Sequence, residues 1–208
     1  RLFSINTQKG SIMTKVAIVY HSGNGHTQRQ AEYIRNGAAS VAGTEVVFLN
    51  VEAAAGPLDL LDACDAIIFG CPTYMGNVSA GMKAFQEQAV SRWFSRAWQD
   101  KIAGAFTHSA NLAGDKESTL HGLMVNAMQH GMIYVSLGLA PAANEPEALA
   151  HIEGAGPNAI NRVDGSIGPM AASAMVAPQD MAPGDLQTAY LYGERVANIT
   201  AQFVRGRI

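Results

Sequence analysis

Short apolar runs alternate with amphipathic stretches along most of the chain. Five of the runs are rich in β-branched and aromatic residues and carry few polar ones, as do strands that are buried on both faces of a sheet. They cover residues 15–20, 45–50, 65–70, 102–108 and 132–137. Apolar residues at helical spacing predict a helix that begins at Thr27 and further helices over residues 58–64, 79–90, 116–130 and 184–205.

This alternation predicts a parallel sheet with helices on both faces, because parallel strands need crossover connections. We therefore expect a doubly wound α/β fold with five parallel strands, in one domain over residues 13–208. Residues 1–12 precede Met13 and are interpreted as an expression remnant or a disordered extension.

Residues 138–183 do not fit the simple alternation. They are rich in Ala, Gly, Pro and Asn and show little periodicity. A loop of that length favours a lid over the site or a contact between subunits, and a disordered excursion is the alternative.

Composition and charge argue against several classes of function. Hydrophobic residues make up 48% of the chain, but no stretch approaches the roughly 20 apolar residues of a membrane helix. The formal net charge is −3 without any Lys/Arg cluster, which argues against nucleic-acid binding. Two cysteines, Cys64 and Cys71, form no disulfide framework and fit a reducing compartment. We expect a soluble, cytoplasmic protein without membrane insertion.

The loop after the first strand has the composition of an anion-binding site. Ser22-Gly23-Asn24-Gly25-His26-Thr27 combines two glycines with hydroxyl groups and leads into a helix, whose first N–H groups and dipole favour an anion. A P-loop would need a lysine at its end, and a Rossmann loop would need glycine where Gln28 stands. The loop therefore predicts a monophosphate held by hydroxyls and main-chain amides. A turn that only caps the helix is the alternative.

Two further loops follow predicted strands at the same edge of the sheet, where ligands bind in open α/β folds. Residues 71–77 (CPTYMGN) combine a proline, an aromatic residue and a glycine, which suits a stiff loop beside a flat ring, although a tight turn would look similar. Residues 107–115 are small and polar, which suits close approach to a planar ligand. His130 lies near a strand boundary rather than inside an apolar face.

Four segments between residues 15 and 206 resemble, in order, the WrbA-like branch of the flavodoxin superfamily, the FMN-binding NAD(P)H:quinone oxidoreductases. They are VAIVYHSGNGHTQ, GCPTYMGNVSAGMKAFQEQ, MQHGMIYVSLG and GDLQTAYLYGERVAN. The most specific is PTYMGN, followed by a helix with Met82, Lys83 and Phe85. The resemblance implies a flavodoxin-like fold with strand order 2-1-3-4-5, one non-covalent FMN and no metal.

By position, the resemblance assigns three groups of residues to FMN. Those that would hold its phosphate are Ser22, Asn24, Gly25, His26 and Thr27. Those that would border the isoalloxazine ring are Pro72, Thr73, Tyr74, Met75, Gly76 and Asn77. Those that would line its other edge are Ser109, Ala110, Asn111, Leu112, Ala113 and Gly114.

The implied reaction is hydride transfer from NAD(P)H, as co-substrate, to a quinone-type acceptor. The resemblance places His130 near the reactive face of the flavin, and we expect it to act as the catalytic residue by donating a hydrogen bond or proton to the quinone. It places Trp93 in the wall of the substrate pocket, across a subunit boundary. Relatives form homodimers and homotetramers, and Trp93, Phe94 and Trp98 are expected to be exposed aromatics at such a contact.

The chain departs from the family pattern at two places. SANLAG replaces a Gly-rich run with threonines after the fourth strand, and residues 161–166 form a different loop within 138–183. These departures affect the docking of nicotinamide or quinone more than flavin binding. Two other functions stay open, an electron carrier without its own NAD(P)H activity and a flavin-free protein that acts through partner contacts.

Overall fold

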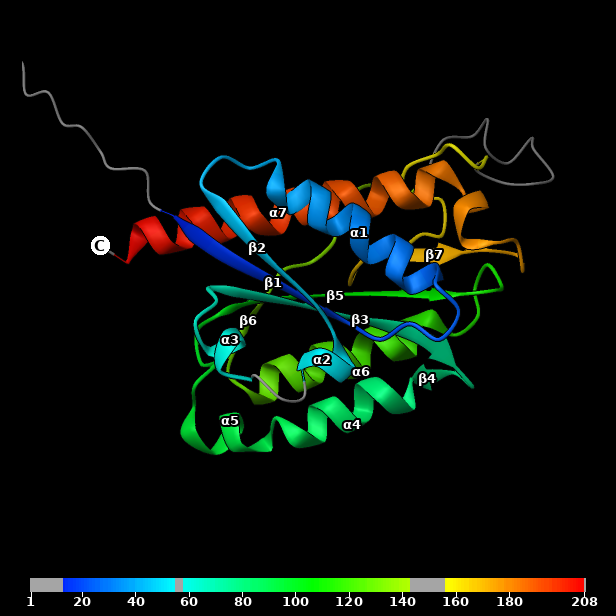
Figure 1. Ribbon diagram of the computed structural model, residues 1–208. Helices are drawn as coiled ribbons and strands as arrows, with labels where there is room; N and C mark the ends of the chain where they lie inside the picture. Colours follow the sequence, from blue (N-terminus) through cyan, green and yellow to red (C-terminus); the bar gives the residue numbers. More distant parts are fainter. Residues whose placement is uncertain (1–12, 55–57, 143–155, 208) are drawn as a thin grey trace, which may run out of the picture.

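A parallel sheet of five core strands forms the centre of the molecule in the computed structural model, which describes residues 13–54, 58–142 and 156–207 (Figure 1). The core strands are β1 (Thr14–Tyr20), β2 (Thr44–Asn50), β3 (Ala66–Tyr74), β5 (Ile102–Ser109) and β6 (Ile133–Tyr134). They lie in the order β2-β1-β3-β5-β6, and each pair is parallel. This confirms the predicted doubly wound fold and its 2-1-3-4-5 order. The interpretation of residues 1–12 lies outside the described residues.

Helices cover both faces of the sheet (Figure 1). One face carries α1 (His26–Ala39) and α7 (Pro183–Gly206), which pack along each other. The other face carries α4 (Ala80–Gln88) and α6 (Lys116–Gln129), with the short helices α2 (Val51–Ala54), α3 (Leu58–Asp62) and α5 (Val90–Ser95). The predicted helix over 79–90 is thus two helices, because the chain turns at Ala89.

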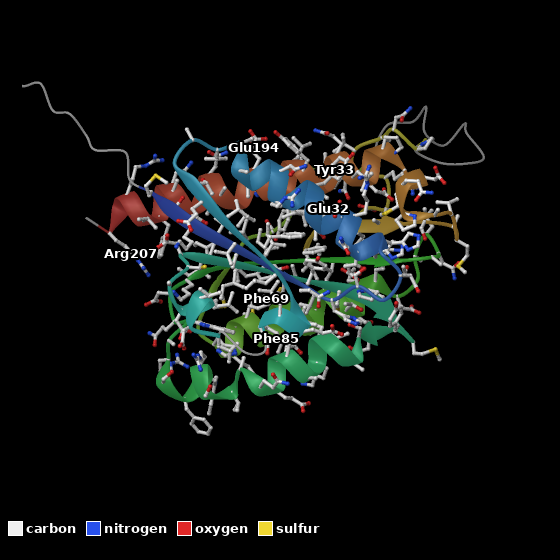
Figure 2. All side chains as sticks on the ribbon, viewed as in Figure 1. Glu32, Tyr33, Phe69, Phe85, Glu194 and Arg207 are labelled. Carbon is white, nitrogen blue, oxygen red and sulfur yellow. The ribbon has the colours of Figure 1, made fainter. Side chains whose placement is uncertain are left out.

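Two apolar clusters fill the spaces between the sheet and its helices. Successive residues of β3 point to opposite faces, as the pleat requires. Ile67 and Phe69 therefore join one cluster, with Phe85 of α4, whereas Ala66 and Ile68 join the other. Figure 2 shows Phe69 and Phe85 in the layer between the sheet and α4.

The outer edge of β5 is shared by two short strands. β6 pairs with Ile102 and Ala103 at its start, and β7 (Met170–Ala172) pairs in parallel with residues 107–109 at its end. The predicted strand over 132–137 is therefore too long. Its later residues bond elsewhere, since the N–H of Leu137 donates to the carbonyl of Ser166.

The third strand is longer than predicted and turns back on itself. β3 continues through Pro72 to Tyr74 and pairs antiparallel with β4 (Asn77–Val78). Met75 and Gly76 connect them, both at positive φ, which is the backbone of a tight two-residue hairpin turn. A proline is tolerated in β3 because β1 ends opposite Gly70, so the strand beyond that point has no β1 partner.

Both cysteines are buried and unpaired. Burial raises the pKa of each thiol to about 11, so neither is a reactive thiolate at neutral pH. No helix in the described part of the chain is long and apolar enough to cross a membrane.

Candidate functional site

A cleft of ≈ 440 Å³ opens at the carboxyl ends of β1, β3 and β5. Four segments form its walls: the loop after β1, the end of β3, the end of β5 with the loop that follows, and part of the segment between β7 and the 3-10 helix η3 (Pro178–Asp180). The lining residues are Ser22, Gly23, Asn24, His26, Thr27, Pro72, Thr73, Tyr74, His108, Ser109, Ala110, Ser173 and Met175.

The loop after β1 is shaped to bind an anion. Ser22 Oγ accepts hydrogen bonds from the N–H groups of Gly25 and Gln28, each at 3.1 Å, and Gly25 has a φ of 87°. Within the described residues, the N–H groups of Asn24, His26 and Thr27 have no hydrogen-bond acceptor. Free amides at a helix N-terminus favour a phosphate or carboxylate, because the helix dipole is positive there.

Two histidines lie together beside this loop. The rings of His26 and His108 stack, and His26 Nε2 lies 2.7 Å from the carbonyl oxygen of Val176. His108 is buried at the end of β5, with Pro72 and Ala171 as its register neighbours. Its buried Nε2 has no hydrogen-bond partner within the described residues. A buried imidazole nitrogen in a cleft wall is available to a bound ligand.

The protonation of His108 is strongly disfavoured. Burial lowers its pKa to about 3, and the neighbouring charges of His26 and Lys116 act in the same direction. His108 is therefore neutral at physiological pH. It offers the cleft a hydrogen-bonding nitrogen rather than a positive charge.

The hairpin after β3 forms the opposite wall. Tyr74 stands against the loop after β1, where a Cβ on Gly23 would overlap its hydroxyl group. Thr73 is tied into the floor, since its Oγ1 lies 2.9 Å from Thr107 Oγ1 and 2.8 Å from Thr119 Oγ1. Tyr74 can therefore border a ring with its side chain, while Thr73 holds β3, β5 and α6 together beneath it.

A buried lysine organises the loop after β5. Lys116 Nζ donates to Ser109 Oγ at 2.8 Å, to the carbonyl of Asn111 at 2.6 Å and to that of Leu112 at 2.8 Å. All three ammonium hydrogens thus have acceptors in this loop. The anchored loop carries Ser109 and Ala110 into the cleft wall.

The segment after β7 completes the cleft. The N–H of Ser173 donates to the carbonyl of Ser109, and that of Ala174 donates to the carbonyl of Ala110. Ala174 and Met175 both have positive φ, which turns the chain over the opening. Where the structure describes it, residues 138–183 thus supply a wall of the cleft. Residues 143–155 lie outside the described residues.

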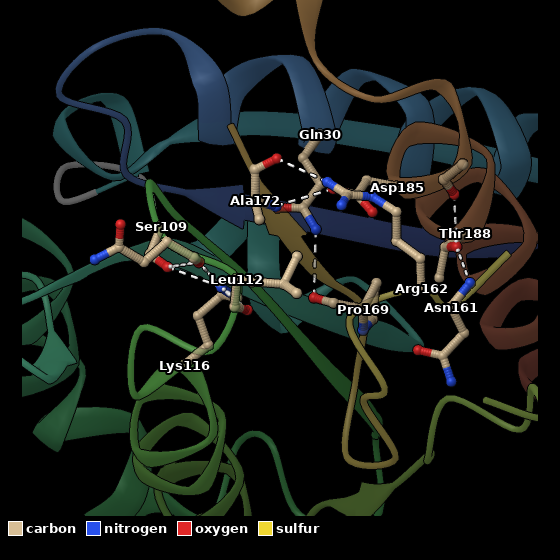
Figure 3. Close-up of polar contacts among 12 residues, drawn as sticks. Gln30, Ser109, Leu112, Lys116, Asn161, Arg162, Pro169, Ala172, Asp185 and Thr188 are labelled. Atoms are coloured by element: carbon tan, nitrogen blue, oxygen red, sulfur yellow. Dashed lines mark hydrogen bonds and ion pairs between the residues drawn. The ribbon is translucent and has the colours of Figure 1, made fainter. Parts of the chain in front are cut away.

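A buried ion pair fixes this wall to the rest of the fold (Figure 3). Arg162 Nη2 donates to Asp185 Oδ2 at 2.8 Å and to the carbonyl of Ala172 at 3.0 Å. The same carboxylate oxygen accepts from the N–H of Ala172 at 2.9 Å. Gln30 of α1 donates to the carbonyl of Pro169. These bonds connect the wall to α7 through Arg162 and Ala172, and to α1 through Pro169.

The structure brings together nine of the residues predicted to bind FMN, and they line the cleft: Ser22, Asn24, His26, Thr27, Pro72, Thr73, Tyr74, Ser109 and Ala110. The remaining ones belong to the same three loops but do not line it: Gly25, Met75, Gly76, Asn77, Asn111, Leu112, Ala113 and Gly114. Four lining residues were missing from the predicted set: Gly23, His108, Ser173 and Met175. Contact of any of them with FMN stays a prediction.

His130 does not reach the cleft of its own chain, and its predicted catalytic role stays a prediction. His130 follows α6 and precedes β6, and the N–H of Asp100, just before β5, donates to the carbonyl of Gly131. It therefore lies where β5 begins, and the cleft is at the other end of that eight-residue strand, roughly 25 Å away. The imidazole is buried against the ring of Trp98, with centroids 4.6 Å apart, so it is not accessible to a substrate.

The three aromatic residues predicted to be exposed differ in the structure. Trp93 and Phe94 of α5 are 41% and 74% exposed and contact each other edge to face. Trp98 is fully buried, and its Nε1 donates to Asp62 Oδ1 at 2.8 Å, so the prediction that it is exposed is wrong. Trp93 does not line the cleft of its own chain. Its contribution across a subunit boundary stays a prediction.

The residues of the cleft fit FMN. The free amides after β1 suit the phosphate, the buried His108 Nε2 lacks a partner, and Tyr74 presents an aromatic ring at the wall. The volume lies in the range of small-molecule sites. Among the described residues that line the cleft none is Lys or Arg, so the amides and hydroxyls would carry that contact.

Comparisons with known proteins found relatives among flavodoxin-fold proteins. The family model described as NADPH-dependent FMN reductase matches residues 52–146. Flavodoxin FldP of Pseudomonas aeruginosa (strain UCBPP-PA14) is 43% identical over 192 residues, which cover 91% of this chain and 98% of the relative. The crystal structure of a WrbA-like flavodoxin from Agrobacterium tumefaciens is 40% identical, with a TM-score of 0.69, and the match covers 91% of this chain and 98% of that one.

A more distant structure shows the fold alone. A flavodoxin from the domain Archaea is 21% identical with a TM-score of 0.60, over 90% of this chain and 99% of that one. The fold, the cleft and the two relatives with at least 40% identity lead to one conclusion. The chain belongs to the WrbA-like family of FMN-binding, flavodoxin-fold oxidoreductases.

Proposed function

We propose that this protein transfers hydride from NAD(P)H to quinone-type acceptors with FMN as its cofactor. The observation that carries the proposal is the character of the cleft. None of its lining residues in the described part of the chain is Asp, Glu, Lys or Arg. An uncharged cleft next to a phosphate loop suits a planar, apolar acceptor, whereas docking of a charged protein partner needs complementary charges.

The rim of the cleft is also apolar. Tyr74 and Met75 of the β3–β4 hairpin are exposed on one side, and Met175 is exposed on the other. Leu112 of the loop after β5 is exposed as well. Flexible methionines and an aromatic ring make an adaptable surface for flat ligands of varied shape. The rim therefore supports alternate docking of a nicotinamide and a quinone at one opening.

Each wall has a part in holding the cofactor. The amides of Asn24, His26 and Thr27 would bind the phosphate, and Tyr74 with Ser109 and Ala110 would border the ring. Bound FMN would supply an isoalloxazine ring that accepts a hydride and gives up both electrons. The chain would hold and orient that ring in the cleft.

The electrons and protons balance in two half-reactions. NAD(P)H loses a hydride, which is two electrons and one proton, and becomes NAD(P)⁺. The quinone gains two electrons and two protons and becomes a hydroquinone, so one further proton comes from the solvent. Two imidazoles in the cleft wall, those of His26 and His108, would orient the acceptor. His108, being neutral, would do so by a hydrogen bond.

An absorbance experiment tests this function. The purified protein is loaded with FMN and then given NADPH or NADH without oxygen, followed by benzoquinone. We expect the oxidised-flavin bands to bleach with the nicotinamide and to return with the quinone, at one equivalent of each per FMN. Bands that stay unchanged after both nicotinamides are added would rule out the enzyme.

An electron carrier is the second candidate, because both relatives with at least 40% identity are named flavodoxins. A carrier would bind FMN in the same cleft but would need a separate reductase. In the experiment above, its bands would bleach only after such a reductase is added. The family model described as an NADPH-dependent FMN reductase favours the enzyme.

The assembly is also a proposal. Val90, Trp93 and Phe94 of α5 form an exposed apolar surface, and aromatic residues are enriched in the cores of protein interfaces. We infer that this α5 surface pairs copies of the chain in a homodimer or homotetramer. Trp93 would then reach the substrate pocket of a neighbouring copy.

A further inference from the structure

Lys116 is a fully buried lysine that has no carboxylate within hydrogen-bonding distance among the described residues. Its side chain has 0% exposure, and its three donors go to one hydroxyl and two carbonyls of the loop after β5. Buried lysines usually pair with an acid, because removing an ammonium from water is costly. The position of Lys116 therefore needs an explanation beyond stability.

The surroundings make this charge more costly. Burial lowers the pKa of the Lys116 ammonium to about 8. Lys116 is also the first residue of α6, where the helix dipole is positive and disfavours a cation. A group held at such a cost is more often part of a functional site than of a purely structural one.

Figure 3 draws Lys116 together with the ion pair of Arg162 and Asp185, and these two charges act on Lys116. The charge of Asp185 favours the protonated Lys116, and that of Arg162 opposes it. Asp185 is already paired with Arg162 at 2.8 Å. The remaining titratable group nearby, His108, is neutral. The buried Lys116 and Asp185 and the partly buried Arg162 thus form a cluster with a net charge of +1 at neutral pH.

This cluster lies directly behind two walls of the cleft. Lys116 holds Ser109, which lines the cleft, and Arg162 with Asp185 holds Ala172, which precedes the lining residue Ser173. The ring of FMN is expected beside Ser109 and Ala110. A net positive charge at this place acts on any negative charge that develops on the ring, with little screening by water.

We propose that Lys116 is a positioning residue whose buried charge makes the cleft bind two-electron-reduced FMN more tightly than oxidised FMN. Reduction by a hydride adds two electrons and one proton to the ring, which gains one negative charge. The donor is NAD(P)H and the final acceptor a quinone, so this inference rests on the proposed function. By stabilising the reduced form, Lys116 favours the acceptance of both electrons together.

The test compares affinities for the two forms of FMN at pH 7.5. The Kd for oxidised FMN comes from fluorescence quenching, and that for chemically reduced FMN comes from an anaerobic titration. Lys116→Gln removes the charge but keeps donors for the loop, and Lys116→Arg keeps the charge. We expect the preference for reduced FMN to fall by about tenfold in Lys116→Gln, as for a unit charge roughly 10 Å away in a protein interior. Lys116→Arg should retain it.

Lys101 offers a matched control at the opposite end of β5. Its Nζ also donates to backbone carbonyls, those of Asp62 and Cys64, and partial burial also lowers its pKa. Lys101→Gln should leave the preference for reduced FMN unchanged. Asp185→Asn keeps the shape of the side chain but removes a charge that favours the protonated Lys116, so it is compared with the wild type at pH 6.5, where Lys116 stays protonated. The cluster then rises to +2, and the preference for reduced FMN should become stronger. That opposite shift keeps the proposal testable if Lys116→Gln folds poorly.

The outcomes separate this inference from the proposed function, because no readout needs nicotinamide or quinone. If Lys116→Gln weakens the binding of both forms equally, Lys116 is only a tether for the loop and the inference is wrong. The same holds if Asp185→Asn leaves the preference unchanged. A wild-type protein that binds FMN with this preference but does not oxidise NAD(P)H would instead contradict the proposed function.

Discussion

His26 and His108 stack face to face in the cleft wall, with ring centroids 4.7 Å apart and ring planes 2° from parallel. Two protonated imidazoles at this separation would repel each other. Burial lowers the pKa of His108 to about 3, and this repulsion acts in the same direction, so His108 stays neutral. This pair connects α1, the helix that follows the phosphate loop, to the end of β5.

The first prediction concerns acid stability. The folded-state pKa of His108 is about 3, and its unfolded value is near 6.5. The unfolded chain thus binds more protons between these values, so His108 contributes stability above pH 6.5 that is lost as the pH falls toward 3. The slope is at most about 1.4 kcal/mol per pH unit. We expect the free energy of unfolding to fall less steeply with decreasing pH in His108→Asn than in the wild type. Urea unfolding from pH 7.5 to 4 measures this dependence.

Carboxylates also titrate in this range, so the comparison is between variants rather than between pH values. His121, which is exposed on α6, is the matched control. His121→Asn should lose stability in acid as the wild type does. Equal slopes for all three proteins would mean that His108 is protonated in the folded state.

The second prediction concerns Gly23. A methyl group there would overlap the Tyr74 hydroxyl, whereas the next atom of that ring, Cζ, lies at a tolerable 3.5 Å. Gly23→Ala should therefore displace Tyr74 and weaken FMN binding about tenfold, since overpacking costs about 1–3 kcal/mol. Adding Tyr74→Phe removes the overlapping atom and should restore most of the affinity. Fluorescence titration of FMN measures both.

Gly156 provides the control for this pair, because a Cβ there meets no atom of the described residues within 4 Å. Gly156→Ala should bind FMN as the wild type does. If Gly23→Ala/Tyr74→Phe binds FMN no more tightly than Gly23→Ala, then Tyr74 does not contact the loop after β1 at Gly23.

Much of the fold follows from sequence patterns, and the exceptions have physical causes. The buried runs of β1 and β3 and the periodicity of α1 gave the correct topology, because both faces of a parallel sheet must be covered. The extension of β3 through Pro72 was missed because proline normally ends a strand. It occurs here only because β1 has already ended.

Sequence patterns likewise predicted only some of the residues of the candidate site. The loop after β1 was identified because hydroxyls and glycines before a helix have a local meaning. His108 was missed although it is a polar residue at the carboxyl end of a strand, which is the available signal. His130 was assigned by resemblance. It precedes β6, and residues before a parallel strand lie at the amino-terminal edge of the sheet, whereas the cleft lies at the carboxyl-terminal edge. The burial of Lys116 and Arg162 has no local signal, since charged residues are usually exposed.

The third prediction concerns the buried ion pair. Arg162→Met leaves the carboxylate of Asp185 buried without its partner, which should cost about 3–5 kcal/mol in the free energy of unfolding. The exposed pair of Lys83 and Glu87 is the control, and Lys83→Met should cost less than about 1 kcal/mol. Denaturant unfolding measures both. Similar losses for the two variants would show that the Arg162 pair is solvated.

The last prediction concerns assembly. Trp93 and Phe94 are exposed on α5, and their transfer into an interface would bury large apolar areas. We expect the wild type to sediment as a dimer or tetramer and Trp93→Glu/Phe94→Glu to sediment as a monomer, because glutamates are poorly tolerated in an interface core. Met13, exposed at the start of β1, is the control, and Met13→Glu should keep the wild-type mass. A wild type that is monomeric at every concentration tested would remove the basis for a pocket shared between subunits. If the double variant still assembles, the contact between subunits lies on a surface other than α5.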